Sequence, residues 1–103
     1  MNRIEKLLEF LKATPEDSFL NHALALEYIK AGDDPAARKL FEALLEKDPG
    51  YVGSYYHLGK LLERAGEPAL AVEVFERGMK EARKSGDTHS YNELQGAYDE
   101  LQD

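Results

Sequence analysis

Apolar side chains recur along this chain at intervals of three and four residues, the spacing that marks one face of an α-helix. The first such stretch covers residues 2–13, with charged side chains on the opposite face. Its apolar members are Ile4, Leu7, Leu8, Phe10 and Leu11. The strict alternation typical of a half-buried strand is absent from the sequence. The pattern therefore predicts an all-α fold.

Prolines, glycines and capping residues divide the pattern into separate helices. Asp17 or Ser18 can cap the second helix, and Gly32 is expected to end it in the left-handed conformation. Asp34 is expected to cap the third helix. Short connections make neighbouring helices antiparallel. The six predicted helices cover 2–13, 18–31, 35–47, 51–65, 68–84 and 88–101.

The same pattern recurs with a period of 34 residues. A fixed period of this length is typical of stacked helical hairpins. Small residues at Ala37, Ala71, Ala25 and Gly59 are expected to let the two helices of a hairpin approach closely. A displacement by 34 places Leu24 on Leu58, Gly32 on Gly66, Ala37 on Ala71, Phe41 on Phe75 and Pro15 on Pro49.

With these residues in phase, the chain resembles the tetratricopeptide repeat, a 34-residue helix–turn–helix unit. Its pattern contains Leu-Gly-x-x-Tyr, then Ala-x-x-x-Phe, then Pro. Arg83 stands at the proline position of the second unit, which lengthens the fifth predicted helix and moves the last one two residues out of register. The matching positions are Asn21, Leu24, Ala25, Tyr28, Ala37, Phe41 and Pro49 in the first unit, and Tyr55, Leu58, Gly59, Ala71 and Phe75 in the second.

The resemblance implies an all-α solenoid of antiparallel helix hairpins, with six helices in about two and a half repeats. We expect a small stand-alone repeat protein that forms one domain over residues 1–103. Its expected parts are a half repeat at 2–15, repeats at 18–51 and 52–85, and a terminal capping helix at 87–103.

Charge and composition exclude some classes of binding partner and indicate the cellular location. The net charge of −7 argues against binding to nucleic acid or to an anionic membrane surface, since both need basic side chains. The absence of cysteine excludes disulfides and thiol chemistry. The N-terminal residues do not resemble a signal peptide, and no apolar run approaches the ~20 residues of a membrane span. We therefore expect a cytoplasmic protein.

The resemblance also implies that the first helix of each hairpin lines a concave groove, which would bind a segment of an unidentified protein or peptide. Two questions stay open. Helix 2–13 either folds back over the apolar residues of the second helix or leaves them as a binding surface. Lys60 and Arg64 either grip a carboxylate or form a solvated face beside Glu63. The expected groove residues are Phe19, His22, Leu26, Ile29, Tyr56, His57, Lys60, Arg64, His89 and Asn92.

Neither a metal site, a cofactor nor an enzyme activity is expected. The histidines His22, His57 and His89 fall on separate helices, whereas metal ligands must converge. The sequence contains no phosphate-binding loop, nucleophile elbow or HExxH motif. Three serines, Ser54, Ser85 and Ser90, lie where helices are expected to begin, and capping accounts for them.

A second function is open beside the scaffold for other proteins. The first helix has no hairpin partner before it, so Ile4 and Leu8 are expected to stay partly uncovered. An apolar edge that meets its own copy would give a two-fold homodimer. The alternative function is therefore a self-associating structural module.

Overall fold

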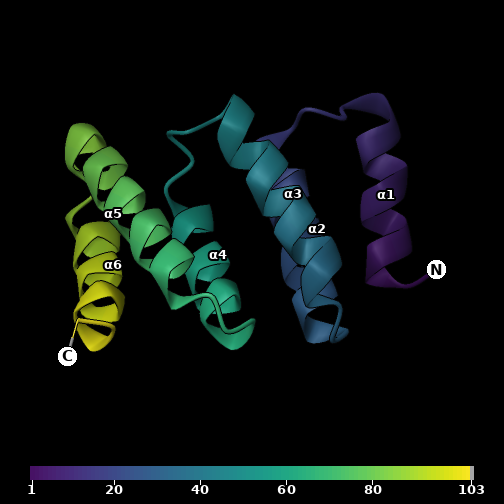
Figure 1. The fold of residues 1–103 in the computed structure, drawn as a ribbon. Coiled ribbons are helices and arrows are strands. Elements are labelled where there is room, and N and C mark those ends of the chain that lie inside the picture. The colour runs from purple at the N-terminus through teal and green to yellow at the C-terminus, as the bar shows by residue number, and fades with distance from the viewer. Residues whose placement is uncertain (103) are drawn as a thin grey trace. The chain divides into compact units, whose positions relative to one another are not determined.

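A computed structural model describes residues 1–102, and in this part of the chain it contains six α-helices and no strand (Figure 1). The all-α prediction is therefore confirmed. The predicted bounds agree with the observed ones to about two residues, the ordinary scatter of helix ends. The helices are α1 (Arg3–Ala13), α2 (Ser18–Lys30), α3 (Asp34–Lys47), α4 (Gly53–Arg64), α5 (Pro68–Ser85) and α6 (Thr88–Glu100).

Local capping explains where α2 and α3 begin. The Asp17 carboxylate accepts a hydrogen bond from the backbone N–H of Leu20 at 2.9 Å, as expected for one of the two candidate caps. At α3 the cap is Asp33, which accepts from the backbone N–H of Ala36 at 3.2 Å. The prediction of Asp34 was wrong by one residue, because Asp34 already has a place in the first turn of the helix.

The three serines do not cap helices. Ser54 is buried inside the first turn of α4, and Ser85 ends α5, where its hydroxyl donates to the carbonyl oxygen of Ala82 at 3.2 Å. The carboxylate of Asp87 caps α6, and it accepts from the backbone N–H of Ser90 at 3.0 Å and from the Ser90 hydroxyl at 2.7 Å. These hydrogen bonds hold the pKa of Asp87 below its usual value.

The chain divides into two compact units, residues 1–48 and the residues from Pro49 onward. In the first unit α2 contacts both α1 and α3 (Figure 1). Its core contains the fully buried Ala25, Ala37 and Phe41, at positions that the repeat pattern reserves for packing. The expected single domain over the whole chain stays a prediction.

In the second unit α5 contacts both α4 and α6, and α4 also contacts α6 (Figure 1). Gly59 lies against Phe75, and a methyl group on Gly59 would overlap the phenyl ring, which confirms the predicted close approach. Gly78 is a second such point. A Cβ atom there would lie 2.6 Å from Cβ of Tyr55 and 2.9 Å from Cδ1 of Leu94, so all three helices meet at Gly78.

Within residues 1–102, none of the helices is both long enough and apolar enough to cross a membrane.

Candidate functional site

The predicted groove residues of α4 lie on three successive turns of the helix: Tyr56 and His57, then Lys60, then Arg64. The rings of Tyr56 and His57 meet edge-on, with centroids 5.6 Å apart. Tyr56, His57 and Lys60 are half-buried, and Arg64 is exposed at the end of the helix. The face therefore offers an aromatic ring, an imidazole and a guanidinium to solvent.

Lys60 is engaged by carboxylates of its own unit. Its Nζ lies 3.3 Å from Oε2 of Glu63 and 4.0 Å from Oε2 of Glu100 on α6. Glu63 Oε2 is buried and accepts no hydrogen bond from the described residues, so the ammonium group of Lys60 supplies its nearby countercharge. Of the two alternatives for Lys60, this arrangement favours an ion pair within the helix surface over a cation available to bind a partner's carboxylate.

His57 links the electrostatics of α4 and α6. Burial lowers the pKa of His57; Glu93 on α6 opposes this effect and Arg64 adds to it. The half-buried imidazole therefore takes up a proton less readily than an exposed histidine does. Nε2 of the exposed His89 lies 3.9 Å from Oε2 of Glu93 on the same helix, and Asn92 is also exposed.

The four predicted residues of α2 belong to the first unit. Phe19 is 65% exposed, whereas His22, Leu26 and Ile29 are half-buried. The ring of His22 meets that of Phe41 edge-on, with centroids 5.7 Å apart. Helix α1 packs on α2 without covering Phe19, and whether this face binds a partner stays a prediction. A single groove over α2, α4 and α6 stays a prediction.

The structure adds one countercharge of Lys60, Glu100, that the sequence pattern did not single out. Glu63 follows Lys60 by three residues, a spacing at which helical side chains meet, so this pair was visible in the sequence. The contact of Lys60 with Glu100 was not, because it depends on the register of α6. Among residues 1–102, no group of three or more His, Asp or Glu side chains is arranged to hold a metal ion.

Comparison with known proteins agrees with this architecture. A family model for the tetratricopeptide repeat matches residues 22–86. The TPR repeat-containing protein PA0015 of Pseudomonas aeruginosa is 31% identical over 91 residues, which make up 88% of this chain and 87% of that protein.

Two solved structures are similar over most of their length. The crystal structure of a tetratricopeptide repeat domain protein from Salinibacter ruber is 42% identical, with a TM-score of 0.81 over 84% of this chain and 96% of that chain. The solution structure of BPP2914 from Bordetella parapertussis is 29% identical, with a TM-score of 0.83 over 98% and 88%. The chain therefore belongs to the tetratricopeptide repeat family, whose members typically act as scaffolds for protein–protein interaction.

Proposed function

We propose that this chain is an adaptor that binds a segment of a partner protein on the face shared by α4 and α6. The proposal rests on one observation: two contacting helices expose a mixed set of recognition groups. Tyr56 offers a rigid aromatic surface, and Arg64 and Asn92 offer hydrogen-bond donors that suit a peptide.

The apolar face of α2, in the first unit, is a second and separate surface proposed to bind a partner. Phe19 supplies the largest exposed apolar area there, and Leu26 and Ile29 supply partly exposed aliphatic groups. Apolar side chains of this kind anchor a partner by burial, while polar groups fix its register.

The ion pair at Lys60 decides how the proposal is tested. A charge reversal at Lys60 would leave Glu63 without its countercharge and would place three carboxylates together, which destabilises the fold itself. Substitutions at Tyr56 and Arg64 are better probes, because neither residue contributes to the buried core.

We would place a photo-crosslinking amino acid at position 56, and at position 80 on α5 as a matched control. Position 80 is exposed and carries none of the proposed contacts. We expect a distinct adduct with a partner at position 56, its loss in the Arg64→Glu background, and no such adduct at position 80. Identical adducts at the two positions would contradict the proposed face.

A second candidate function, self-association through α1, is favoured by Leu8. This leucine is 44% exposed at the position where the two later 34-residue repeats carry Glu42 and Glu76. A homodimer would bury it. Light scattering over micromolar concentrations should then show a dimer that Leu8→Glu converts to a monomer. A wild-type chain that stays monomeric over this range excludes the dimer as its working form.

A further inference from the structure

A cavity of about 420 Å³ lies between α2 and α3, within the first unit. This volume falls in the range of about 300–1,000 Å³ that is usual for ligand-binding pockets. Its lining residues are different from the predicted groove residues of α2. We name this cavity the Asn21 pocket, and define it by Ser18, Asn21, Leu40, Ala43, Leu44 and Asp48.

The second unit fills the corresponding place with an aromatic ring. Tyr55 follows Asn21 by one period of 34 residues, and its side chain is almost fully buried. The hydroxyl of Tyr55 donates to the carbonyl oxygen of Pro49 at 2.6 Å. The guanidinium carbon of Arg77 lies 5.7 Å from the centroid of the Tyr55 ring. This place in the repeat therefore accepts a phenol that a cation covers.

The first unit keeps the hydrogen bond of this tyrosine but not its ring. Nδ2 of Asn21 donates to the carbonyl oxygen of Pro15 at 3.0 Å, and Pro15 is in phase with Pro49. The same nitrogen donates to the carbonyl oxygen of Asp17 at 2.9 Å. Both hydrogens of the amide are thereby used, so the Asn21 side chain is fixed at the turn before α2. The volume of an aromatic ring is left unfilled beside it.

Two exchanges on α3 shape the rest of the pocket. Ala43 is in phase with Arg77, so the side chain that covers the tyrosine ring in the second unit has no counterpart here. Leu44 is in phase with Gly78 and is buried, so it occupies part of the vacated space. Leu40 is half-buried one turn earlier. The α3 wall of the pocket is therefore aliphatic, and it is open to solvent at the exposed Ala43.

The pocket also contains a carboxylate where the second unit has a methyl group. Asp48 is half-buried and in phase with the fully buried Ala82. Oδ2 of Asp48 accepts from the Ser18 hydroxyl at 2.6 Å, which fixes the orientation of the carboxylate. A carboxylate accepts several hydrogen bonds, so Asp48 can accept another from a group inside the pocket. An aromatic ring that carries an N–H or O–H donor suits these walls, whereas an anion does not.

We infer that the Asn21 pocket binds the side chain of a tryptophan or tyrosine from a partner protein, with its indole N–H or phenol O–H donating to the carboxylate of Asp48. The ring would pack against Leu40 and Leu44. The pocket is separate from the α4–α6 face and from the apolar face of α2. This inference therefore does not rest on the proposed function.

The size of the pocket favours a protein side chain over a free aromatic molecule. A cavity of about 150 Å³ is enough to hold a benzene ring. The Asn21 pocket is larger, and its opening at Ala43 leaves room for the backbone from which a side chain enters. Aromatic side chains that fill a pocket and donate one hydrogen bond at their far end are common anchors of protein–protein contacts.

The test uses the full chain and a blocked pentapeptide with tryptophan between glycines. The chain contains no tryptophan, so the emission of the peptide reports on binding alone. Amide chemical shifts of the isotope-labelled chain give the location. We expect saturable shifts at Ala43 and Leu44 with a dissociation constant of about 1 mM, as one aromatic side chain can provide.

Two matched peptides separate the ring from its donor. A peptide with leucine in place of tryptophan should cause no saturable shift. A peptide whose indole nitrogen is methylated keeps the ring and lacks the N–H group. It should bind at least about threefold more weakly than the tryptophan peptide, the effect of one lost hydrogen bond.

Three variants of the chain make the assignment specific. Ala43→Arg places a guanidinium over the opening, as Arg77 covers Tyr55, and should weaken binding at least about tenfold. Asp48→Asn should abolish the preference for the indole with a free N–H. Ala69→Arg makes the same exchange at an exposed position of α5 and should change nothing. Circular dichroism confirms that each variant is folded.

Three results would overturn the inference. The first is that the tryptophan peptide causes no saturable shift at Ala43 and Leu44 at millimolar concentrations. The second is equal binding to the wild type and to Ala43→Arg. The third is tighter binding of free indole than of the peptide, since this would assign the pocket to a small molecule.

Discussion

The glycines inside the helices of the second unit have two different structural roles. Gly78 sits where Tyr55 and Leu94 come together, and Gly96 has no heavy atom within 4 Å of the place where a Cβ would be. The first glycine is needed for packing, and the second only lowers the helix propensity of an exposed turn of α6.

This difference gives a paired prediction. Gly78→Ala should lower the free energy of unfolding by about 1–3 kcal/mol, because the methyl group has no space. Gly96→Ala should raise it by up to about 1 kcal/mol through helix propensity alone. Urea denaturation followed by circular dichroism measures both, and equal effects of the two substitutions would contradict the packing argument.

His57 should make stability depend on pH. Burial lowers its pKa in the folded chain, whereas the unfolded chain takes up the proton near the ordinary value of 6.5. Acid therefore favours the unfolded state, and the contribution is present above 6.5 and is lost as pH falls from 6.5 through the folded pKa.

The measurement compares urea midpoints at about pH 7.5 and about pH 5.5, the range in which histidine titrates. We expect His57→Gln to show a smaller loss of stability on acidification than the wild type. His89→Gln, which removes an exposed imidazole from the same unit, is the control. A wild-type pH dependence in His57→Gln would rule out this role.

At the scale of single residues, the sequence predicted correctly those positions where the backbone conformation allows essentially one residue type. Gly32, which was predicted to end its helix in the left-handed conformation, has a φ angle of +81°, and Gly66, in phase with it, has +78°. The prediction failed at Gly78, because the residue in phase with it in the first unit is Leu44 and the pattern gave no sign of a close approach.

At the scale of the element, α5 shows how a helix is lengthened when Arg83 replaces the proline of the repeat pattern. The helix runs for 18 residues and passes through Arg83 to end at Gly86. Nη2 of Arg83 donates to the hydroxyl of Tyr91 on α6 at 2.7 Å, and its guanidinium lies 5.0 Å from the centroid of that ring. The added length therefore gives α5 a polar contact with α6 that a proline would not supply.

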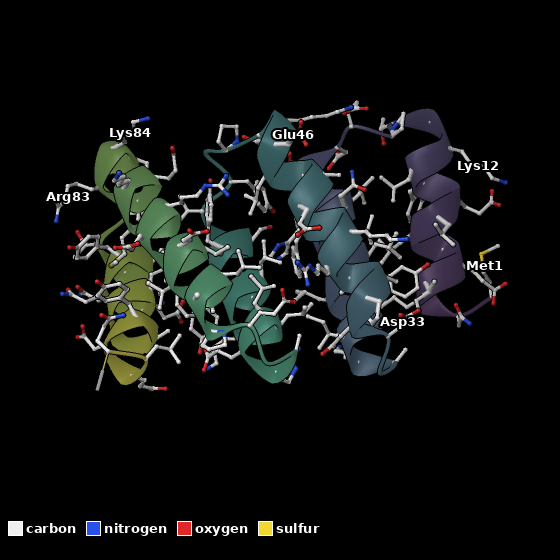
Figure 2. All side chains as sticks on the ribbon, in the orientation of Figure 1. Met1, Lys12, Asp33, Glu46, Arg83 and Lys84 are labelled. Atoms are coloured by element: carbon white, nitrogen blue, oxygen red, sulfur yellow. The ribbon has the colours of Figure 1, made fainter. Side chains whose placement is uncertain are left out.

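Arg83 and its neighbour Lys84 both project from the end of α5 (Figure 2), which makes them a matched pair. Lys84, whose side chain is 75% exposed, has its Nζ 3.6 Å from Oε2 of Glu81. Arg83→Ala should destabilise the chain by about 1 kcal/mol, the worth of an exposed cation–π contact with a hydrogen bond.

Lys84→Ala should change stability by less than about 0.5 kcal/mol, since exposed ion pairs of this kind contribute little. Thermal unfolding of the two variants is the measurement. A larger loss in Lys84→Ala than in Arg83→Ala would show that the contact with Tyr91 does not hold α5 and α6 together.

The lengthened helix and the shift of α6 could be predicted, because both follow from one absent proline. The contacts that result could not. The pairs Arg83–Tyr91 and Lys60–Glu100 depend on how far α6 is displaced along α5, a distance that no residue pattern states. The helix faces of the candidate site and the pair Lys60–Glu63 could therefore be predicted, whereas the contact of Lys60 with Glu100 could not.

At the scale of the whole molecule, the two units differ in how completely their cores are built. In the second unit all three helices contact one another, and Tyr55, Phe75 and Leu94 are almost fully buried. In the first unit α1 contributes a single buried side chain, Leu7, and Phe10 stays exposed. Repeat proteins of this kind owe their stability to such neighbouring contacts.

Separate fragments should reflect this difference. We expect residues 49–103 to fold alone with a cooperative thermal transition, and residues 1–48 to be largely unfolded at about 25 °C, because fewer helix contacts offset its chain entropy. Circular dichroism melts of the two fragments provide the comparison. A cooperative transition in fragment 1–48 together with an unfolded fragment 49–103 would contradict this ranking.

The two-residue displacement of α6 also limits how such a chain can be lengthened by duplication. A copied block of 34 residues inserted between Pro15 and Pro49 preserves the phase of every later helix. The same block joined after Ser85 would set its first helix two residues early, a rotation of about 200° that exchanges its buried and exposed faces. Only a block of 36 residues would restore the place of Leu94, so we expect a 34-residue duplication to keep the helix faces in phase at the first join and to misplace them at the second.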